Sequence, residues 1–227
     1  MIIKTFVEPP IDNNNYLIID ENSRDAALID CSSPAIWNDV PYTKGNVSAS
    51  TAGETRGEVK DVNLKYILLT HGHFDHIAGI KPKTAFIPDS ANRESPKVYM
   101  HKADLEWDNQ VNTYMPMMGM AEMNIPEIDV FVNDGDIIRL GNMEIKVMHT
   151  PGHTQGGVCY YVDGVLFSGD TIFREAVGRC DLPGGDFEQI VESIENKIYK
   201  LPDDTIIYPG HGKKTTVGWE KEHNLFL

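Results

Sequence analysis

Four side chains that can bind a metal ion fall within six consecutive positions of this sequence: His71, His73, Asp75 and His76. The apolar run 66–69 comes directly before them and is typical of a short buried strand. Side chains two positions apart on a strand point the same way, so the first two histidines can face one point. Buried imidazole and carboxylate groups without partners are costly. The cluster therefore indicates a metal site rather than a polar loop.

Three further candidates lie downstream, each after a short apolar run and beside a glycine. His153 stands in the segment HTPGHT, Asp170 in SGDT and His211 in YPGHG. Glycine lets the chain turn sharply, so each of these side chains is expected where a strand ends. A single metal ion needs only three or four protein ligands. Six ligands and one shared carboxylate are therefore a set for two ions, and imidazole with carboxylate suits zinc, iron or manganese.

The order of these motifs resembles that of one known family. The pattern H-x-H-x-D-H, followed by PGH, GD and GH over almost the whole chain, is similar to that of the metallo-β-lactamase superfamily. Three accessory stretches are similar to hydroxyacylglutathione hydrolase (glyoxalase II)-like members: Asn15-Tyr16, the run 178–185 and the ending from Pro209. The sequence stops sixteen residues after His211. It thus resembles a short form without the C-terminal helical domain that carries glutathione-binding basic residues in longer members.

The expected fold class is α/β (α+β), with one hydrolase domain over residues 1–227. Apolar segments predict strands in two groups: 2–7, 16–19 and 26–29, then 143–148, 158–162 and 165–167. Helical spacing of apolar residues predicts a helix over 186–199. Two groups of strands followed by helices indicate two stacked mixed sheets flanked by helices, and the resemblance implies the same four-layer αββα sandwich. The turn Asp134-Gly135 predicts a hairpin between 128–132 and 137–140.

The resemblance also implies a role for each candidate ligand. Three imidazoles would hold the first ion, a mixed set the second, and one carboxylate would bridge them: His71, His73 and His153; Asp75, His76 and His211; and Asp170. Both ions are expected to be zinc, with iron or manganese also suited to the second site. Water between two cations is deprotonated near neutral pH and becomes the nucleophile. Asp75 would orient this nucleophile and carry a proton toward the leaving group.

Two residues outside the ligand set have two interpretations each. Arg179 can bind a substrate carboxylate through its planar fork, or it can pair internally with Asp181. Asp30 follows the third predicted strand, where superfamily relatives often hold an aspartate against the metal loop. The alternative is that Asp30 caps a turn or a helix.

Two segments near the motifs have no regular pattern. The polar stretch 42–61 is predicted to be a surface loop insertion, with a substrate-facing lid as the alternative. Five methionines crowd into Met115–Met123. Because methionine adapts to irregular apolar shapes, this segment either fills the core or forms a pliable wall over the active site or at a subunit contact.

Charge and cysteine content restrict the partners and the compartment. The formal net charge is −14 and the sequence pI is near 4.9, so the surface repels polyanions and nucleic acid is not an expected partner. No apolar run is long enough for a membrane span. Three cysteines form an odd count without paired spacing, which favours a reduced, cytoplasmic chain. A small-molecule substrate is expected, and the choice between monomer and homodimer stays open.

The resemblance implies a metal-dependent hydrolase, most simply a thioesterase of the hydroxyacylglutathione hydrolase type. Small acyl thioesters such as S-lactoylglutathione suit this machinery because a thiolate leaves without full protonation. A lactonase or a phosphodiesterase would keep all seven ligands and is the main alternative. A persulfide dioxygenase with one iron is disfavoured by the complete second ligand set, and a zinc β-lactamase commonly has cysteine at the position of Asp170. The non-enzyme alternative is a metal-stabilised binding protein without catalysis.

Overall fold

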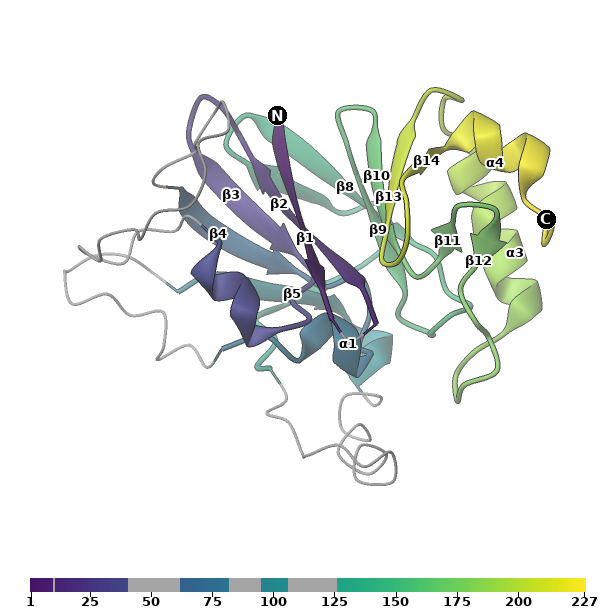
Figure 1. The fold of residues 1–227 in the computed structure, drawn as a ribbon, viewed down its shortest axis with the longest axis horizontal. Helices are drawn as coiled ribbons and strands as arrows, with labels where there is room; N and C mark the ends of the chain where they lie inside the picture. Colours follow the sequence, from purple (N-terminus) through teal and green to yellow (C-terminus); the bar gives the residue numbers. More distant parts are fainter. Residues whose placement is uncertain (10, 41–61, 82–94, 106–125) are drawn as a thin grey trace.

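The computed structural model of the protein describes residues 1–9, 11–40, 62–81, 95–105 and 126–227. The predicted loop insertion at 42–61 and the methionine-rich segment Met115–Met123 lie outside the described residues. Two β-sheets, one built from the first part of the chain and one from the second, dominate the ribbon in Figure 1. The functional residues lie where loops from both sheets meet.

The first sheet has six strands in the order β1-β2-β3-β4-β5-β6. The pairs β1–β2 and β2–β3 are antiparallel, whereas β3 to β6 are parallel neighbours. The strands are β1 (Ile2–Glu8), β2 (Asn13–Ile19), β3 (Asp25–Ile29), β4 (Asn63–Leu68), β5 (Lys97–His101) and β6 (Val130–Val132). Every residue of β2 is buried, as expected for a strand whose two faces are both covered.

The second sheet also has six strands, in the order β14-β13-β10-β9-β8-β7. Only the pair β10–β13 is parallel among its described pairings. The strands are β7 (Ile137–Leu140), β8 (Met143–His149), β9 (Val158–Val162), β10 (Val165–Gly169), β13 (Ile206–Pro209) and β14 (Thr215–Thr216). A small antiparallel pair, β11 (Ile172–Phe173) and β12 (Ala176–Val177), follows β10.

A hydrophobic core fills the space between the two sheets. Tyr16 and Ile18 of β2 face this core, and Ile145, Tyr160 and Phe167 of the second sheet pack against it from the other side. The intervening residues of β2 point to the opposite face, because side chains alternate along a strand, and join a separate core on the outer side of the first sheet. A third core lies on the outer side of the second sheet. This layering confirms the predicted αββα sandwich.

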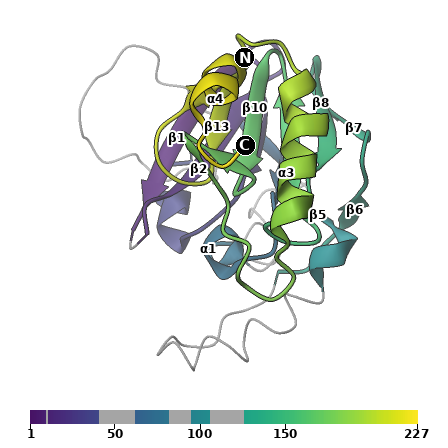
Figure 2. The same ribbon diagram turned by 90° about the vertical axis from the view of Figure 1, so that its right-hand side faces the viewer.

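Short helices cover the outer faces of both sheets. Figure 2 shows α3 and α4 together on the outer face of the second sheet, while the buried Ile36 and Trp37 of η1 pack on the first. The helices are η1 (Pro34–Asn38), α1 (Phe74–Ile77), η3 (Lys102–Asp104), α3 (Phe187–Asn196), η5 (Ile198–Lys200) and α4 (Val217–His223). In the described part of the chain, none of the helices has the length and apolar character needed to cross a membrane.

The turn at Asp134-Gly135 is present, but the predicted hairpin is wrong. Gly135 has a positive φ of 84°, and the amide of Asn133 donates to Asp136, so a tight turn does form. The two flanking strands nevertheless pair in different sheets, β6 parallel to β5 and β7 antiparallel to β8. A turn motif fixes only the local backbone path. Burial against two different sheet neighbours decides the pairing, and the turn carries the chain from one sheet to the other.

The sheet topology gathers the metal-binding motifs at one edge. The loops that carry them follow the C-terminal ends of β4, β8, β10 and β13, and β10 and β13 are parallel, so their ends meet at the same edge. The N-terminal end of β2 reaches this edge as well, because Asn13 forms an isolated bridge with His211. Strand ends from both sheets therefore converge on one site.

The outer core of the second sheet generates a stability prediction. The predicted helix 186–199 is observed as α3 and η5, capped by Asp186, and Ile190, Ile194 and Ile198 are its fully buried residues. Ile194→Ala should lower the free energy of unfolding by ~2–5 kcal/mol, because it removes buried methyl groups and leaves a cavity. Urea unfolding measures this loss. Val191→Ala, on the same helix but only partly buried, is the matched control; equal losses would contradict the observed packing.

Candidate metal centre

The seven candidate ligands predicted from the sequence are brought together by the structure. They form three groups whose possible ligand atoms lie within 4.8 Å of one another: His71, His73 and His153; His71, His76 and Asp170; and Asp75, His76 and His211. The groups share members, so they make one continuous cluster. Most of these side chains are buried, and His211 is the most exposed at 26%. The cluster is therefore largely buried and lies at the edge where the strand ends of the two sheets meet.

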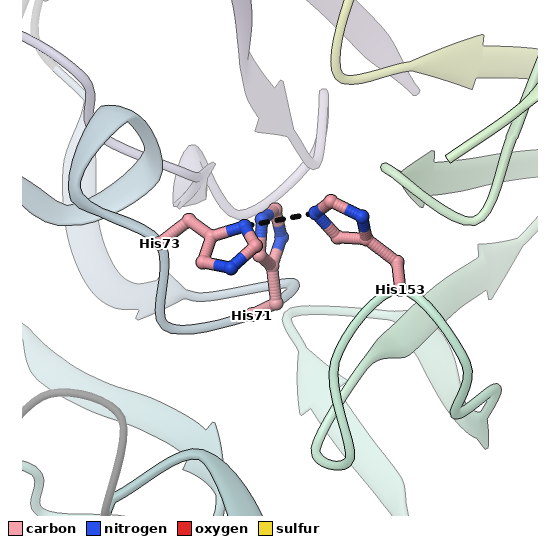
Figure 3. Close-up of side chains that lie close together, drawn as sticks. All are labelled: His71, His73 and His153. Atoms are coloured by element: carbon pink, nitrogen blue, oxygen red, sulfur yellow. Dashed lines mark hydrogen bonds between the residues drawn. The ribbon is translucent and has the colours of Figure 1, made fainter. Parts of the chain in front are cut away.

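The first group consists of three imidazoles that point toward one another, as Figure 3 shows. Nε2 of His153 lies 2.8 Å from Nδ1 of His73. The ring of His71 stands edge-on to both, with centroid distances of 4.7 Å and 4.8 Å. Nδ1 of His71 contacts the Thr70 hydroxyl at 3.1 Å, which leaves Nε2 turned to the cluster. Three convergent ring nitrogens match the ligand set of a catalytic zinc site.

The second group mixes imidazoles with a carboxylate. Oδ2 of Asp75 lies 3.5 Å from Nε2 of His76 and 3.3 Å from Nε2 of His211. Asp75 and His76 belong to α1, and His211 follows β13, so the group joins both sheets. This set is harder than three imidazoles and suits zinc, iron or manganese.

Asp170 lies between the two groups. Its Oδ1 is 3.4 Å from Nε2 of His76, and its Oδ2 is 3.6 Å from Nε2 of both His153 and His211. One carboxylate thus reaches imidazoles from each side of the cluster, as a bridging ligand would. Gly210 makes this close approach feasible, since a side chain there would collide with Oδ1 of Asp170.

Two imidazoles of the first group, those of His71 and His73, are held neutral by their surroundings. Burial lowers the pKa of His71 well below its usual value, and neighbouring imidazoles lower it further. Burial, together with His153, lowers the pKa of His73 to about 3. Neutral imidazole is the form that binds metal ions. His71 and His73 therefore present lone pairs at neutral pH.

The carboxylates make the other side of the cluster favour positive charge. Burial disfavours an imidazolium at His76, but Asp30, Asp170 and Asp75 outweigh it and raise the pKa of this ring. Burial also disfavours ionisation of Asp170, yet His76 and other imidazoles hold the pKa of its carboxyl well below the usual range. A site whose carboxylates favour positive charge is the environment that a divalent cation needs.

Two buried polar atoms test whether metal ions fit these residues. Among the residues that the structure describes, Nε2 of His71 and Oδ1 of Asp170 are buried and lack a hydrogen-bond partner. Such atoms are rare in folded proteins because their desolvation is not compensated. Both belong to one of the groups of possible ligand atoms, where a cation would satisfy them. The residues therefore fit divalent metal ions.

Asp30 supports the cluster from behind. Its Oδ1 accepts from the amide of Thr70, and its Oδ2 accepts from the Thr70 hydroxyl, both at 2.8 Å. Oδ2 also lies 2.8 Å from Nδ1 of His76. The carboxylate thus orients His76 so that Nε2 faces Asp75 and Asp170. Asp30 therefore lies against the metal-binding loop, which is the first of the two interpretations offered by the sequence, and it does not cap a turn or a helix.

Two of the three consecutive asparagines at the start of β2, Asn13 and Asn14, hold the cluster as well, and the sequence reasoning missed both. The side-chain amide of Asn13 lies 2.9 Å from Nε2 of His76. The amide of Asn14 donates to the backbone oxygens of Pro209 and Gly212, on either side of His211. Asparagine is depleted in strands. A run of asparagines at the start of an apolar strand is therefore the sequence signal that could have indicated Asn13 and Asn14.

Arg179 is paired inside the chain. Its Nε and one terminal nitrogen each donate to Asp181 at 2.8 Å, which is the internal pair that the sequence offered as an alternative. The side chain is 61% exposed. Its backbone oxygen lies 2.7 Å from Nδ1 of His153. The Arg179 segment therefore borders the first group through its backbone.

Comparisons with known proteins show the family to which the chain belongs. Residues 9–211 match the metallo-beta-lactamase superfamily. Hydroxyacylglutathione hydrolase GloC of Haemophilus influenzae is 34% identical over 206 residues, 85% of this chain and 90% of that protein. The crystal structure of BLEG-1 B3 metallo-beta-lactamase aligns over 99% of both chains with a TM-score of 0.79 and 31% identity. TTHA1623 in a di-iron-bound form aligns over 99% of this chain and 100% of that one, with a TM-score of 0.76 and 30% identity. The chain belongs to the metallo-β-lactamase superfamily of metal-dependent hydrolases.

Proposed function

We propose that the protein is a two-metal hydrolase of small acyl thioesters. The observation that carries the proposal is the position of Asp170, with one oxygen toward His76 and the other toward His153 and His211. Asp170 would be a ligand of both ions. His71, His73 and His153 would hold the first ion, and Asp75, His76 and His211 the second.

Two divalent cations in these positions would supply an activated water at neutral pH and a Lewis acid for the substrate carbonyl. The chain's own residues determine how a proton moves beside them. Burial disfavours a charged Asp75, but His76 and His211 hold the pKa of its carboxyl below the usual value, so it is ionised near pH 7. An ionised carboxylate can orient the attacking water at Oδ2, accept its proton and pass it toward the leaving group.

The thioester preference rests on similarity and on leaving-group chemistry. The relative from Haemophilus influenzae is named as a hydroxyacylglutathione hydrolase and covers most of this chain. A thiolate leaves without full protonation, so a site with one nearby carboxylate suffices. In the proposal, S-lactoylglutathione is among the substrates. Arg179 would bind a substrate carboxylate in place of Asp181.

One specific observation favours a second activity for testing. A structural neighbour at 31% identity is titled a B3 metallo-beta-lactamase. A β-lactam therefore belongs beside lactones and phosphodiesters among the rival substrates. All of these would use the same cluster, so kinetic comparison rather than geometry separates them.

Zinc is the metal that we assign to the first group, because three neutral imidazoles and an open position match catalytic zinc. For the second group we assign zinc as well, with iron or manganese as alternatives, since a carboxylate is among its ligands. The neighbour described in a di-iron-bound form supports iron as an alternative.

We also propose a small-molecule substrate and a cytoplasmic location for the protein. A formal net charge of −14 suits a small-molecule substrate rather than nucleic acid, which requires a basic surface. The described cysteines Cys31, Cys159 and Cys180 are free, as expected in the reducing cytoplasm. Every ligand in the proposal comes from one chain, so a monomer or a homodimer would carry the same site.

Metal content separates the bridging ligand from the terminal ligands. Gently purified protein loaded with excess metal should contain about two equivalents by elemental analysis. Asp170→Ala should weaken both sites, because the carboxylate faces both groups, whereas His211→Ala should keep about one equivalent. Arg179→Ala is the control and should keep both, since its side chain points to Asp181. Saturation of the unmodified protein at one equivalent would reject the two-metal centre.

The substrate class is tested by turnover under one set of metal conditions. S-lactoylglutathione, a homoserine lactone, a phosphodiester and a β-lactam are compared at equal enzyme and metal concentrations. The thioester should have the highest kcat/KM, with a margin of at least tenfold, which corresponds to about 1.4 kcal/mol of transition-state stabilisation. His211→Ala provides the background rate. A tenfold advantage for any rival would overturn the thioester assignment while leaving the metal centre intact.

A further inference from the structure

Asp104 is a buried carboxylate to which the proposed chemistry gives no role. It ends the short helix η3, directly after β5, and is 1% exposed. Its Oδ2 accepts from the amide of Gly72 at 2.9 Å and from the Thr154 hydroxyl at 2.8 Å. Its Oδ1 accepts from the amide of Gly156 at 2.5 Å. All three donors belong to two loops, 70–73 and 150–157.

These two loops carry the three imidazoles of the first group. Gly72 lies between His71 and His73, and Thr154 follows His153 directly. The first loop continues β4 of the first sheet, and the second connects β8 and β9 of the second sheet. One carboxylate therefore ties together the backbones that set the spacing of the three ring nitrogens, without touching any of the rings itself.

The surroundings of Asp104 leave little free space, and they require a side chain that accepts hydrogen bonds. A side chain at Gly156 would collide with the carboxyl carbon and Oδ1 of Asp104. Burial raises the pKa of the Asp104 carboxyl, while the hydrogen bonds from Thr154, Gly72 and Gly156 and the nearby His153 oppose that rise. Two of the three partners are backbone amides, which can only donate. An asparagine of the same shape would turn its own N–H₂ group toward at least one of these donors.

Asp30 makes a comparable arrangement on the other side of the cluster. It binds the backbone and hydroxyl of Thr70 and orients His76, which belongs to the second group. Asp104 thus lies behind the first group alone, whereas Asp30 contacts the second group through His76 and the first through Thr70, whose hydroxyl contacts His71. Each is a buried aspartate that follows a strand of the first sheet and fixes a metal-binding loop through at least one backbone amide.

We infer that Asp104 is the positioning residue of the three-imidazole site, and that it sets the affinity of this site separately from the second. The inference rests on the proposed two-metal centre. Residues that orient metal ligands typically change metal affinity by about 10–100-fold when they are mutated. Asp104 is expected to act on the first ion alone, whereas Asp30, which holds both Thr70 and His76, is expected to act on both ions.

Titration with Co²⁺, followed by visible absorption and by competition with a chelator, tests this division. Asp104→Asn should weaken one of two ions by about 10–100-fold and leave the other near its original affinity. With one equivalent of Co²⁺, its spectrum should match that of His153→Ala, in which only the second group is complete. Asp30→Asn should instead weaken both ions, because it loosens both Thr70, which contacts His71, and His76. Turnover is not needed for either measurement.

Asp20 provides a matched control. It is 4% exposed and accepts from the amides of Asn22 and Asn142 and from the Ser23 hydroxyl, so it has the same kinds of partners as Asp104. It lies just beyond the C-terminal end of β2, whereas Asn13 at the other end of this strand contacts the cluster. Asp20→Asn should lower the stability in urea but keep both Co²⁺ affinities.

Different results would contradict the two-metal centre and the positioning role of Asp104. If the unmodified protein binds fewer than two Co²⁺ ions, the two-metal centre fails. If it binds two, and Asp104→Asn binds both with unchanged affinities, the positioning role is wrong. Should Asp104→Asn fail to fold, Thr154→Val removes a single hydrogen bond to the same carboxylate and should weaken the first ion alone. Thr154→Ser should restore it, and equal behaviour of the two variants would also overturn the inference.

Discussion

Charge balance in a buried cluster is the constraint on which the metal-binding edge depends. Asp30 and Asp170 are almost fully removed from water, and so are the imidazoles of His71 and His76. Isolated charges in such surroundings would be far too costly. Asp170 meets this constraint by facing imidazoles on two sides, and Asp30 by binding Thr70 and His76. Each buried charge thereby forces the approach of a second loop.

Hydrogen bonds across the sandwich keep those loops in register. The hydroxyl of Tyr16 donates to the backbone oxygen of Pro209 at 2.6 Å, and Asn14 binds the same carbonyl. Tyr160 of the second sheet donates to the backbone oxygen of Leu69, immediately before the first metal-binding loop. The hydrophobic core between the sheets sets their distance, and these directional bonds fix the loops at its edge. Packing alone would not position ring nitrogens to within fractions of an ångström.

The candidate ligands were easier to predict from the sequence than the side chains that hold their loops, and the reason is physical. Each ligand follows an apolar strand and sits beside glycine or in a dense cluster, so its signal is local. Asp104 and Asn14 act on loops that are far away in the sequence, and nothing beside them marks that role. The hairpin predicted at Asp134 failed for the same reason, because strand pairing is decided by distant neighbours. Local patterns predicted strands and the helix 186–199, and together with the resemblance they predicted the sandwich. The tertiary hydrogen bonds have no local pattern, so only the three-dimensional structure reveals them.

The pairing of Arg179 with Asp181 is compatible with a role in substrate binding. Both side chains are largely exposed, and exposed ion pairs contribute little to stability because water screens them. A substrate carboxylate could therefore replace Asp181 at little cost. The backbone of Arg179 is fixed independently, since its oxygen contacts Nδ1 of His153. In the proposed function, the guanidinium would thus exchange Asp181 for a substrate carboxylate while the His153 imidazole keeps its orientation.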